Sequence, residues 1–112
     1  WKPLPMVNGW TNSNSNGAAA LRYRKGADGK ITYVTGIIKL EDALSDENQI
    51  FAYLPEGYRP KQHYWAGVCV DNNKTFWPYR IDLDGRIYIN SLNASAQASA
   101  KVGMWVNLTI PI

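Results

Sequence analysis

The sequence predicts an all-β fold, either an antiparallel β-sandwich or a β-barrel, with about eight short strands in one domain over residues 1–112. Short runs of β-branched and aromatic residues alternate with clusters of Gly, Asn, Asp and Pro, at a spacing typical of such folds. No stretch longer than about ten residues keeps a helical period. A chain of 112 residues can bury one hydrophobic core, whereas two cores would each be marginal. We therefore expect a single β domain.

The expected strands cover residues 4–8, 18–25, 31–39, 49–53, 63–70, 76–82, 86–91 and 104–110. The acidic segment from Glu41 to Glu47 is the one helical candidate, of one or two turns. Residues 11–17 are Thr, Asn, Ser and Gly, whose side chains favour turns over strand ladders, and they predict a loop. Residues 91–100 alternate small and polar side chains without a large apolar anchor, and we interpret them as a second loop rather than a short helix.

A hairpin is expected around Asp84-Gly85, and the alternation on its two sides determines how the strands pair. A two-residue loop would place the apolar sets of the two strands on opposite faces. A three-residue loop over residues 83–85, with Gly85 in the left-handed conformation, avoids this conflict. It places Ile81 opposite Ile87 and Tyr79 opposite Ile89 on the core side, where Trp77 also falls.

The same register predicts the outer face of this hairpin. Its expected cross-strand pairs are Asp82 with Arg86, Arg80 with Tyr88, and Pro78 with Asn90. A ring, a guanidinium group, a carboxylate and an amide would then lie side by side, which suits a polar ligand better than a protein core.

The last strand also has two distinct faces. Its core face is expected to carry Met104, Val106, Leu108 and Ile110. Trp105 falls on the other face with Asn107 and Thr109, where it meets solvent, packs against a neighbouring subunit or lines a site.

Residues for catalysis or metal binding are scarce. His63 and Cys69 are the only His and Cys, and on one extended strand they would lie roughly 20 Å apart, too far for a nucleophile pair. One His and one Cys cannot supply a zinc site. The carboxylates of Asp82, Asp84 and the acidic segment at 41–47 follow turn chemistry and lack the spacing of a calcium loop. We therefore expect no enzymatic activity, no metal and no cofactor.

The charge and the hydropathy of the chain give no sign of a nucleic-acid binder or of a membrane-spanning segment. The net charge of +3 and a pI near 9.1 are mildly basic, without the dense Lys/Arg stripe typical of nucleic-acid binders. No apolar run approaches the ~20 residues that cross a bilayer, and residues 1–10 lack the features of a signal peptide. Because the chain opens with Trp1, we expect it to be an excerpt of a longer protein.

One motif carries a family resemblance. The segment Leu54-Pro55-Glu56-Gly57-Tyr58-Arg59-Pro60, the Asp-Gly hairpin over residues 81–89 and the closing strand over 105–109 resemble C-terminal domains of tail-fibre and baseplate proteins from phages of Gram-positive bacteria. The resemblance covers residues 49–112. Physically the motif is a strand stop and corner, because Pro55 removes a ladder donor and Pro60 keeps Arg59 extended.

The resemblance implies a receptor-binding head domain in the virion, at the phage tail tip. Such heads are usually homotrimers that bind a host cell-wall saccharide and join other tail or baseplate proteins through a region N-terminal to the head. It implies no catalytic residue, and it supplies no saccharide-binding motif that can be aligned here.

The chemistry of a sugar selects the candidate site. A sugar presents an apolar C–H face and a fringe of hydroxyls, which match aromatic rings and planar polar groups. The candidate saccharide-binding residues are His63, Trp65, Trp77, Arg80, Asp82, Tyr88 and Asn90. Two alternatives stay open: a small barrel that binds single-stranded nucleic acid through Arg22, Arg24, Lys25 and Lys30, and a ligand-free trimerisation or capping domain.

Overall fold

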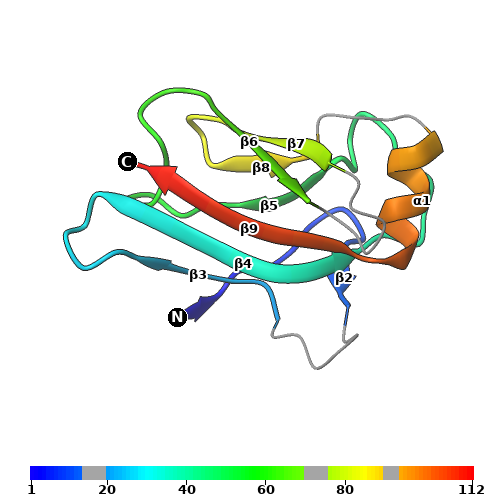
Figure 1. The fold of residues 1–112 in the computed structure, drawn as a ribbon, viewed down its shortest axis with the longest axis horizontal. Helices are drawn as coiled ribbons and strands as arrows, with labels where there is room; N and C mark the ends of the chain where they lie inside the picture. Colours follow the sequence, from blue (N-terminus) through cyan, green and yellow to red (C-terminus); the bar gives the residue numbers. More distant parts are fainter. Residues whose placement is uncertain (14–19, 70–75, 90–93) are drawn as a thin grey trace.

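The computed structural model describes residues 1–13, 20–69, 76–89 and 94–112, and only the backbone at 64–69, 76–77 and 94–95. Two antiparallel sheets pack face to face (Figure 1). The five-stranded sheet contains β1 (Lys2–Pro3), β2 (Thr11–Asn12), β3 (Arg22–Lys25), β4 (Ile31–Lys39) and β9 (Met104–Pro111). The four-stranded sheet has the order β5 (Ile50–Tyr53), β8 (Arg86–Tyr88), β7 (Phe76–Ile81), β6 (Tyr64–Cys69). The predicted antiparallel all-β fold is confirmed, and of the two expected forms, sandwich and barrel, the two sheets form a sandwich.

β4 is the central strand of the five-stranded sheet. It pairs with β9 from Ile31↔Pro111 to Ile38↔Met104. It also pairs with β3 over Thr32 to Thr35 and with β2 at Ile38 and Lys39. The loop expected over residues 11–17 is therefore wrong at Thr11 and Asn12, because these two residues complete the ladder beside the end of β4; residues 14–17 lie outside the described residues.

The core lies between the two sheets, as the alternation of apolar residues predicts. β9 buries Met104, Val106, Leu108 and Ile110 and exposes the residues between them. The four-stranded sheet contributes Phe51, Tyr79, Ile81 and Ile87 from its inner face. The Tyr79 hydroxyl donates to the Trp105 carbonyl across the core at 2.9 Å, so this buried phenol has a partner.

The β7–β8 hairpin has the predicted register. Arg80 pairs with Tyr88 and Ile81 with Ile87. Gly85 has a φ of 91°, and its N–H donates to the Asp82 carbonyl at 2.9 Å, which closes the three-residue loop. The expected partner of Pro78, Asn90, and the side chain of Trp77 lie outside the described residues.

The corner at residues 54–60 packs directly against this hairpin. The Leu54 N–H donates to the Gly85 carbonyl at 2.8 Å, and the Arg59 Nε donates to the Leu54 carbonyl at 2.7 Å. The Tyr58 carbonyl accepts a hydrogen bond from the buried Thr32 hydroxyl at 2.9 Å. The motif thus has the architectural role expected of it, and Arg59 supports the corner.

Residues 94–102 correct one prediction, because they form helix α1 (Ala94–Val102) instead of a loop. Ala is the best helix former, and Ala96 and Ala100, one turn apart, are both fully buried. The Leu40 N–H donates to the Ala100 carbonyl at 2.8 Å, so the helix lies close to the end of β4. Small side chains permit this approach, and a search for large apolar anchors misses such a helix.

The segment over 41–47 corrects a second prediction, because it forms no helix and residues 46–49 form a turn. The Ser45 N–H donates to the Asn48 Oδ1 at 2.6 Å, and the Asn48 Nδ2 donates to the Ala43 carbonyl at 2.7 Å. These side-chain bonds compete with helical ones. The strand expected over 4–8 is displaced as well: β1 is Lys2–Pro3, Met6 makes an isolated bridge to Ala52, and Asn8-Gly9 turns at positive φ.

Candidate functional site

A buried carboxylate organises a group of polar side chains on the four-stranded sheet. Asp82 follows β7 directly, and its side chain is only 4% exposed. Four side chains converge on it: those of His63, which precedes β6, Arg80 on β7, and Arg86 and Tyr88 on β8. We call these five residues the Asp82 cluster.

The contacts of Asp82 use both carboxylate oxygens. Oδ1 lies 2.7 Å from His63 Nδ1 and accepts from Arg80 Nε at 2.8 Å. Oδ2 lies 2.9 Å from the Arg86 guanidinium and accepts from the Tyr88 hydroxyl at 3.3 Å. An ionised carboxylate can only accept, so His63 Nδ1 must carry a proton in this arrangement. The hydrogen bonds hold the imidazole and the Arg80 guanidinium in set orientations.

The local charges explain how the carboxylate stays ionised. Burial alone would raise the pKa of Asp82, but hydrogen bonds from Arg80 and His63 and the attraction of Arg80 and Arg86 outweigh it and lower that pKa below its ordinary value. Burial raises the pKa of Tyr88, and the negative charge of Asp82 adds to this effect. The site therefore holds a carboxylate anion and a neutral phenol at neutral pH.

The groups that a ligand would meet are the donors around Asp82. The side chains of His63, Arg80 and Arg86 are 50%, 30% and 40% exposed. Arg86 also contacts Asp84 at 2.9 Å, where the Asp84 side chain is 57% exposed. The sequence places the Asp82 carboxylate on the outer face, and the structure covers it with its own partners. Asp82 thus orients the side chains around it and is not itself open to a ligand, whereas the carboxylate of Asp84 is exposed.

A hollow of about 320 Å³ borders the cluster at His63. It is lined by Pro60, Lys61, Gln62, His63, Pro111 and Ile112. Its volume lies at the lower end of the range for small-ligand sites. A ligand in the hollow would contact the imidazole on one side and the end of β9 on the other.

The structure places the predicted site residues as follows. His63, Arg80, Asp82 and Tyr88 come together, and Trp65 pairs with Arg80 in the β6–β7 register. Trp77 pairs with Val68, and the side chains of Trp65 and Trp77 and all of Asn90 lie outside the described residues. Arg86 belongs to the cluster but is missing from the predicted set, although the hairpin register already places it opposite Asp82.

His63 and Cys69 lie at opposite ends of β6. Within residues 1–13, 20–69, 76–89 and 94–112, no three His, Cys, Asp or Glu side chains gather in a way that could hold a metal ion. In the same part of the chain, no helix is long and apolar enough to cross a membrane.

Comparison of the chain with protein-family models, with curated proteins and with solved structures finds no match.

Proposed function

We propose that this domain binds a saccharide without catalysis, through the exposed side of the Asp82 cluster. The observation that carries this proposal is the convergence of an imidazole, two guanidinium groups and a phenol on one buried carboxylate beside a hollow. Donors that are already oriented lose little conformational entropy when a ligand binds. Sugar hydroxyl oxygens and ring substituents suit such planar donors.

The biological setting of the proposal follows from the resemblance of residues 49–112 to phage tail heads. On this proposal the domain is the host-adhesion head of a phage tail or baseplate protein, it assembles as a homotrimer, and its ligand is a host cell-wall saccharide. Its structural support is the all-β sandwich, together with the corner and the hairpin, which pack against each other.

The test is calorimetric titration of the domain with solubilised cell-wall polysaccharide from Gram-positive bacteria, with the oligomeric mass measured in the same buffer. The proposal expects saturable binding by a trimer. Trimers that bind no saccharide would instead support a structural role. Binding that weakens steeply with salt and is shared by an oligonucleotide would support the nucleic-acid alternative.

Variants locate the site. His63 and Tyr88 are the suitable targets, because removing Asp82 or Arg80 would break the ion pair between these two residues, in which Asp82 is buried. His63→Ala and Tyr88→Phe should each weaken saccharide binding by about tenfold, the loss of one good hydrogen bond. Lys101→Ala, on the exposed side of α1, is the matched control and should bind as the parent does. Equal binding by all of these proteins would show that the saccharide binds elsewhere.

A further inference from the structure

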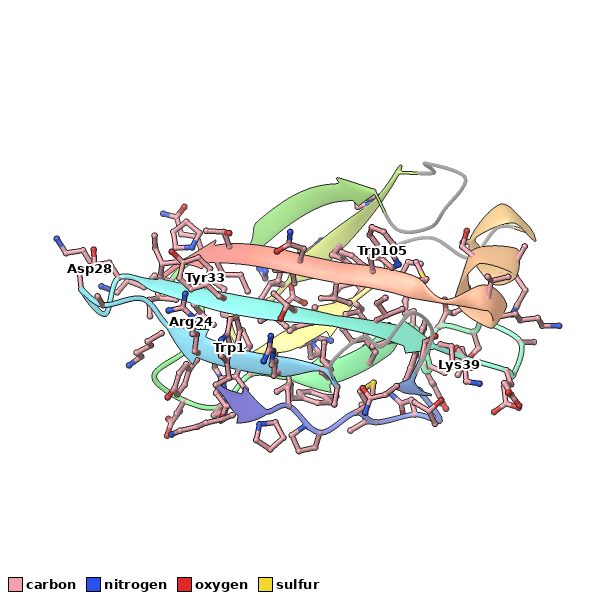
Figure 2. All side chains as sticks on the ribbon, turned by 60° about the horizontal axis from the view of Figure 1, so that its bottom comes forward. Trp1, Arg24, Asp28, Tyr33, Lys39 and Trp105 are labelled. Atoms are coloured by element: carbon pink, nitrogen blue, oxygen red, sulfur yellow. The ribbon has the colours of Figure 1, made fainter. Side chains whose placement is uncertain are left out.

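The outer face of the five-stranded sheet carries a second group of aromatic and cationic side chains, far from the Asp82 cluster. In Figure 2, Trp1, Arg24 and Tyr33 lie together over β3 and β4, and Trp105 lies farther along β9. Trp105 is 43% exposed and Trp1 is 51% exposed. Exposed rings with a polar edge, beside cations on the same sheet face, can contact a ligand that has both apolar and charged groups.

A hollow of about 300 Å³ lies on this face between β3, β4 and β9. The sheet register places its lining residues in a row, because Arg22 pairs with Thr35, Thr35 with Asn107, and Ile37 with Trp105. The row offers an indole and an isoleucine as an apolar wall. It also offers a hydroxyl, an amide and a guanidinium as hydrogen-bonding groups.

Arg22 supplies the second observation. Its Nε is buried and has no hydrogen-bond partner among the described residues. Its guanidinium lies 4.6 Å from the centroid of the Trp1 ring, which restrains its position. Neither Arg22 nor Arg24 forms an ion pair with a carboxylate in the described part of the chain. A buried donor without a partner is costly, and a ligand acceptor would satisfy it.

The charge of this face is complementary to an anion. Arg24 lies between two rings, 4.9 Å from Trp1 and 4.6 Å from Tyr33. Two restrained guanidinium groups thus lie on the same face as the hollow.

We infer that this hollow binds one anionic sugar residue, with the C–H face of the sugar on Trp105 and its carboxylate or phosphate on Arg22. Thr35 and Asn107 are placed to bond the hydroxyls. The site is distinct from the Asp82 cluster and lies on the opposite sheet, so either can fail without the other.

The observations favour a sugar over a nucleic-acid strand. A strand needs a series of stacking rings and cations along a groove. Of the four cations expected to follow phosphates, Lys25 lies over the Tyr58 ring at 4.8 Å, and Lys30 lies in the turn between β3 and β4. Of these four cations, Arg22 and Arg24 remain on the face, and Lys39, on the same face of β4, contacts Glu41 at 3.4 Å. Two cations without a carboxylate partner suit a single charged sugar residue.

The test compares three probes by titration at low salt: a glucuronate-containing hexasaccharide, a neutral N-acetylglucosamine hexamer and a ten-nucleotide oligothymidylate. The hexasaccharide should bind best. Trp105→Ala should weaken its binding at least tenfold, and Arg22→Gln should abolish the preference for the charged over the neutral sugar. Lys101→Ala is the control, and nuclear magnetic resonance of the indole N–H groups checks that each variant is folded.

Several outcomes of the binding titrations would each overturn this inference. They are no binding of the hexasaccharide, equal binding of the neutral hexamer, tighter binding of the oligothymidylate, and binding that the two variants leave unchanged. Dissociation of an oligomer by Trp105→Ala, measured by sedimentation, would identify the face as a contact between copies of the chain and would overturn it too. Loss of binding in His63→Ala alone would assign the sugar to the Asp82 cluster instead.

Discussion

Gly85→Ala should be among the most destabilising single substitutions in this domain. Gly85 has a φ of 91°, and an added Cβ would lie 2.4 Å from the Leu54 carbonyl oxygen and 2.8 Å from the Arg59 Nε. A left-handed conformation costs a residue with a side chain about 1–2 kcal/mol. Displacing the corner would also weaken two hydrogen bonds, Leu54 N–H to the Gly85 carbonyl and Arg59 Nε to the Leu54 carbonyl, each contributing about 1 kcal/mol. The expected loss in the free energy of unfolding is therefore about 3–4 kcal/mol.

Gly29→Ala is the matched control for this prediction. Gly29 also has a positive φ, 72°, but an added Cβ would meet nothing within 4 Å. Its substitution should cost the conformational part alone, about 1 kcal/mol. Urea denaturation followed by tryptophan fluorescence measures both values. If the two variants lose equal stability, the contact between the corner and the hairpin does not have the importance assigned to it.

Three further outcomes are expected. Asp82→Asn should destabilise the domain by about 1.5–3 kcal/mol at pH 7, because it removes the charge that Arg80 contacts, whereas Arg86 keeps its contact with Asp84. Folding lowers the pKa of Asp82, so the stability that its ionised carboxylate contributes is present above about pH 4 and is lost as the pH falls through the folded pKa. If the urea midpoints of the parent and of Asp82→Asn differ by the same amount at pH 7 and at pH 2.5, this expectation is contradicted. Tyr79→Phe should lower the free energy of unfolding by about 1 kcal/mol, the contribution of one hydrogen bond. Burial raises the pKa of Tyr79, so an alkaline absorbance titration should show that this phenol ionises only when the domain unfolds. Ala96→Leu should lower the free energy of unfolding by about 1–3 kcal/mol in thermal unfolding, because the larger side chain overpacks the buried side of α1. Ala98→Leu, on the exposed side of the same helix, is the control and should leave stability unchanged. Equal losses of stability in the two variants would contradict this packing.

The hairpin and β9 could be predicted from the sequence, because the alternation of apolar and polar residues determines which residues share a face of the sheet. Once Ile81 and Ile87 must share the core side, only an odd loop length is compatible, and Gly85 is the residue that can take the left-handed position. In β9, four alternate apolar residues define the buried face without further information. Both predictions depend only on neighbours along the chain.

Elements governed by distant contacts could not be predicted in this way. Helix α1 has small residues because it lies against the end of β4, and the sequence contains no sign of that approach. The segment over 41–47 has a helical composition, but Gln97, from α1, donates to the Asp42 carbonyl at 3.0 Å and accepts from the Leu44 N–H. These bonds join segments far apart in the chain.

The candidate site shows the same division. The alternation along the two strands predicts Arg80, Asp82 and Tyr88 on one face, and in the structure Arg80 and Tyr88 both bond the Asp82 carboxylate. Parity does not reveal that the longer side chains around Asp82 cover its carboxylate, because that depends on rotamers and on His63, which comes from another strand end. The sequence therefore predicts which hairpin residues belong to the cluster, but not that the Asp82 carboxylate is buried.

The hydrogen bond between Tyr79 and the Trp105 carbonyl has a consequence for the two outer faces. The indole of Trp105 lies on one face, and Arg80, the chain neighbour of Tyr79, lies on the other. The side chain of Tyr79, which crosses the core and ends in this hydrogen bond, therefore connects the two sheets that carry these surfaces. If a ligand on either surface shifts this connection, thermodynamic reciprocity requires that the affinities of the two sites change by the same factor. Saturating one site while titrating the other would measure that factor directly.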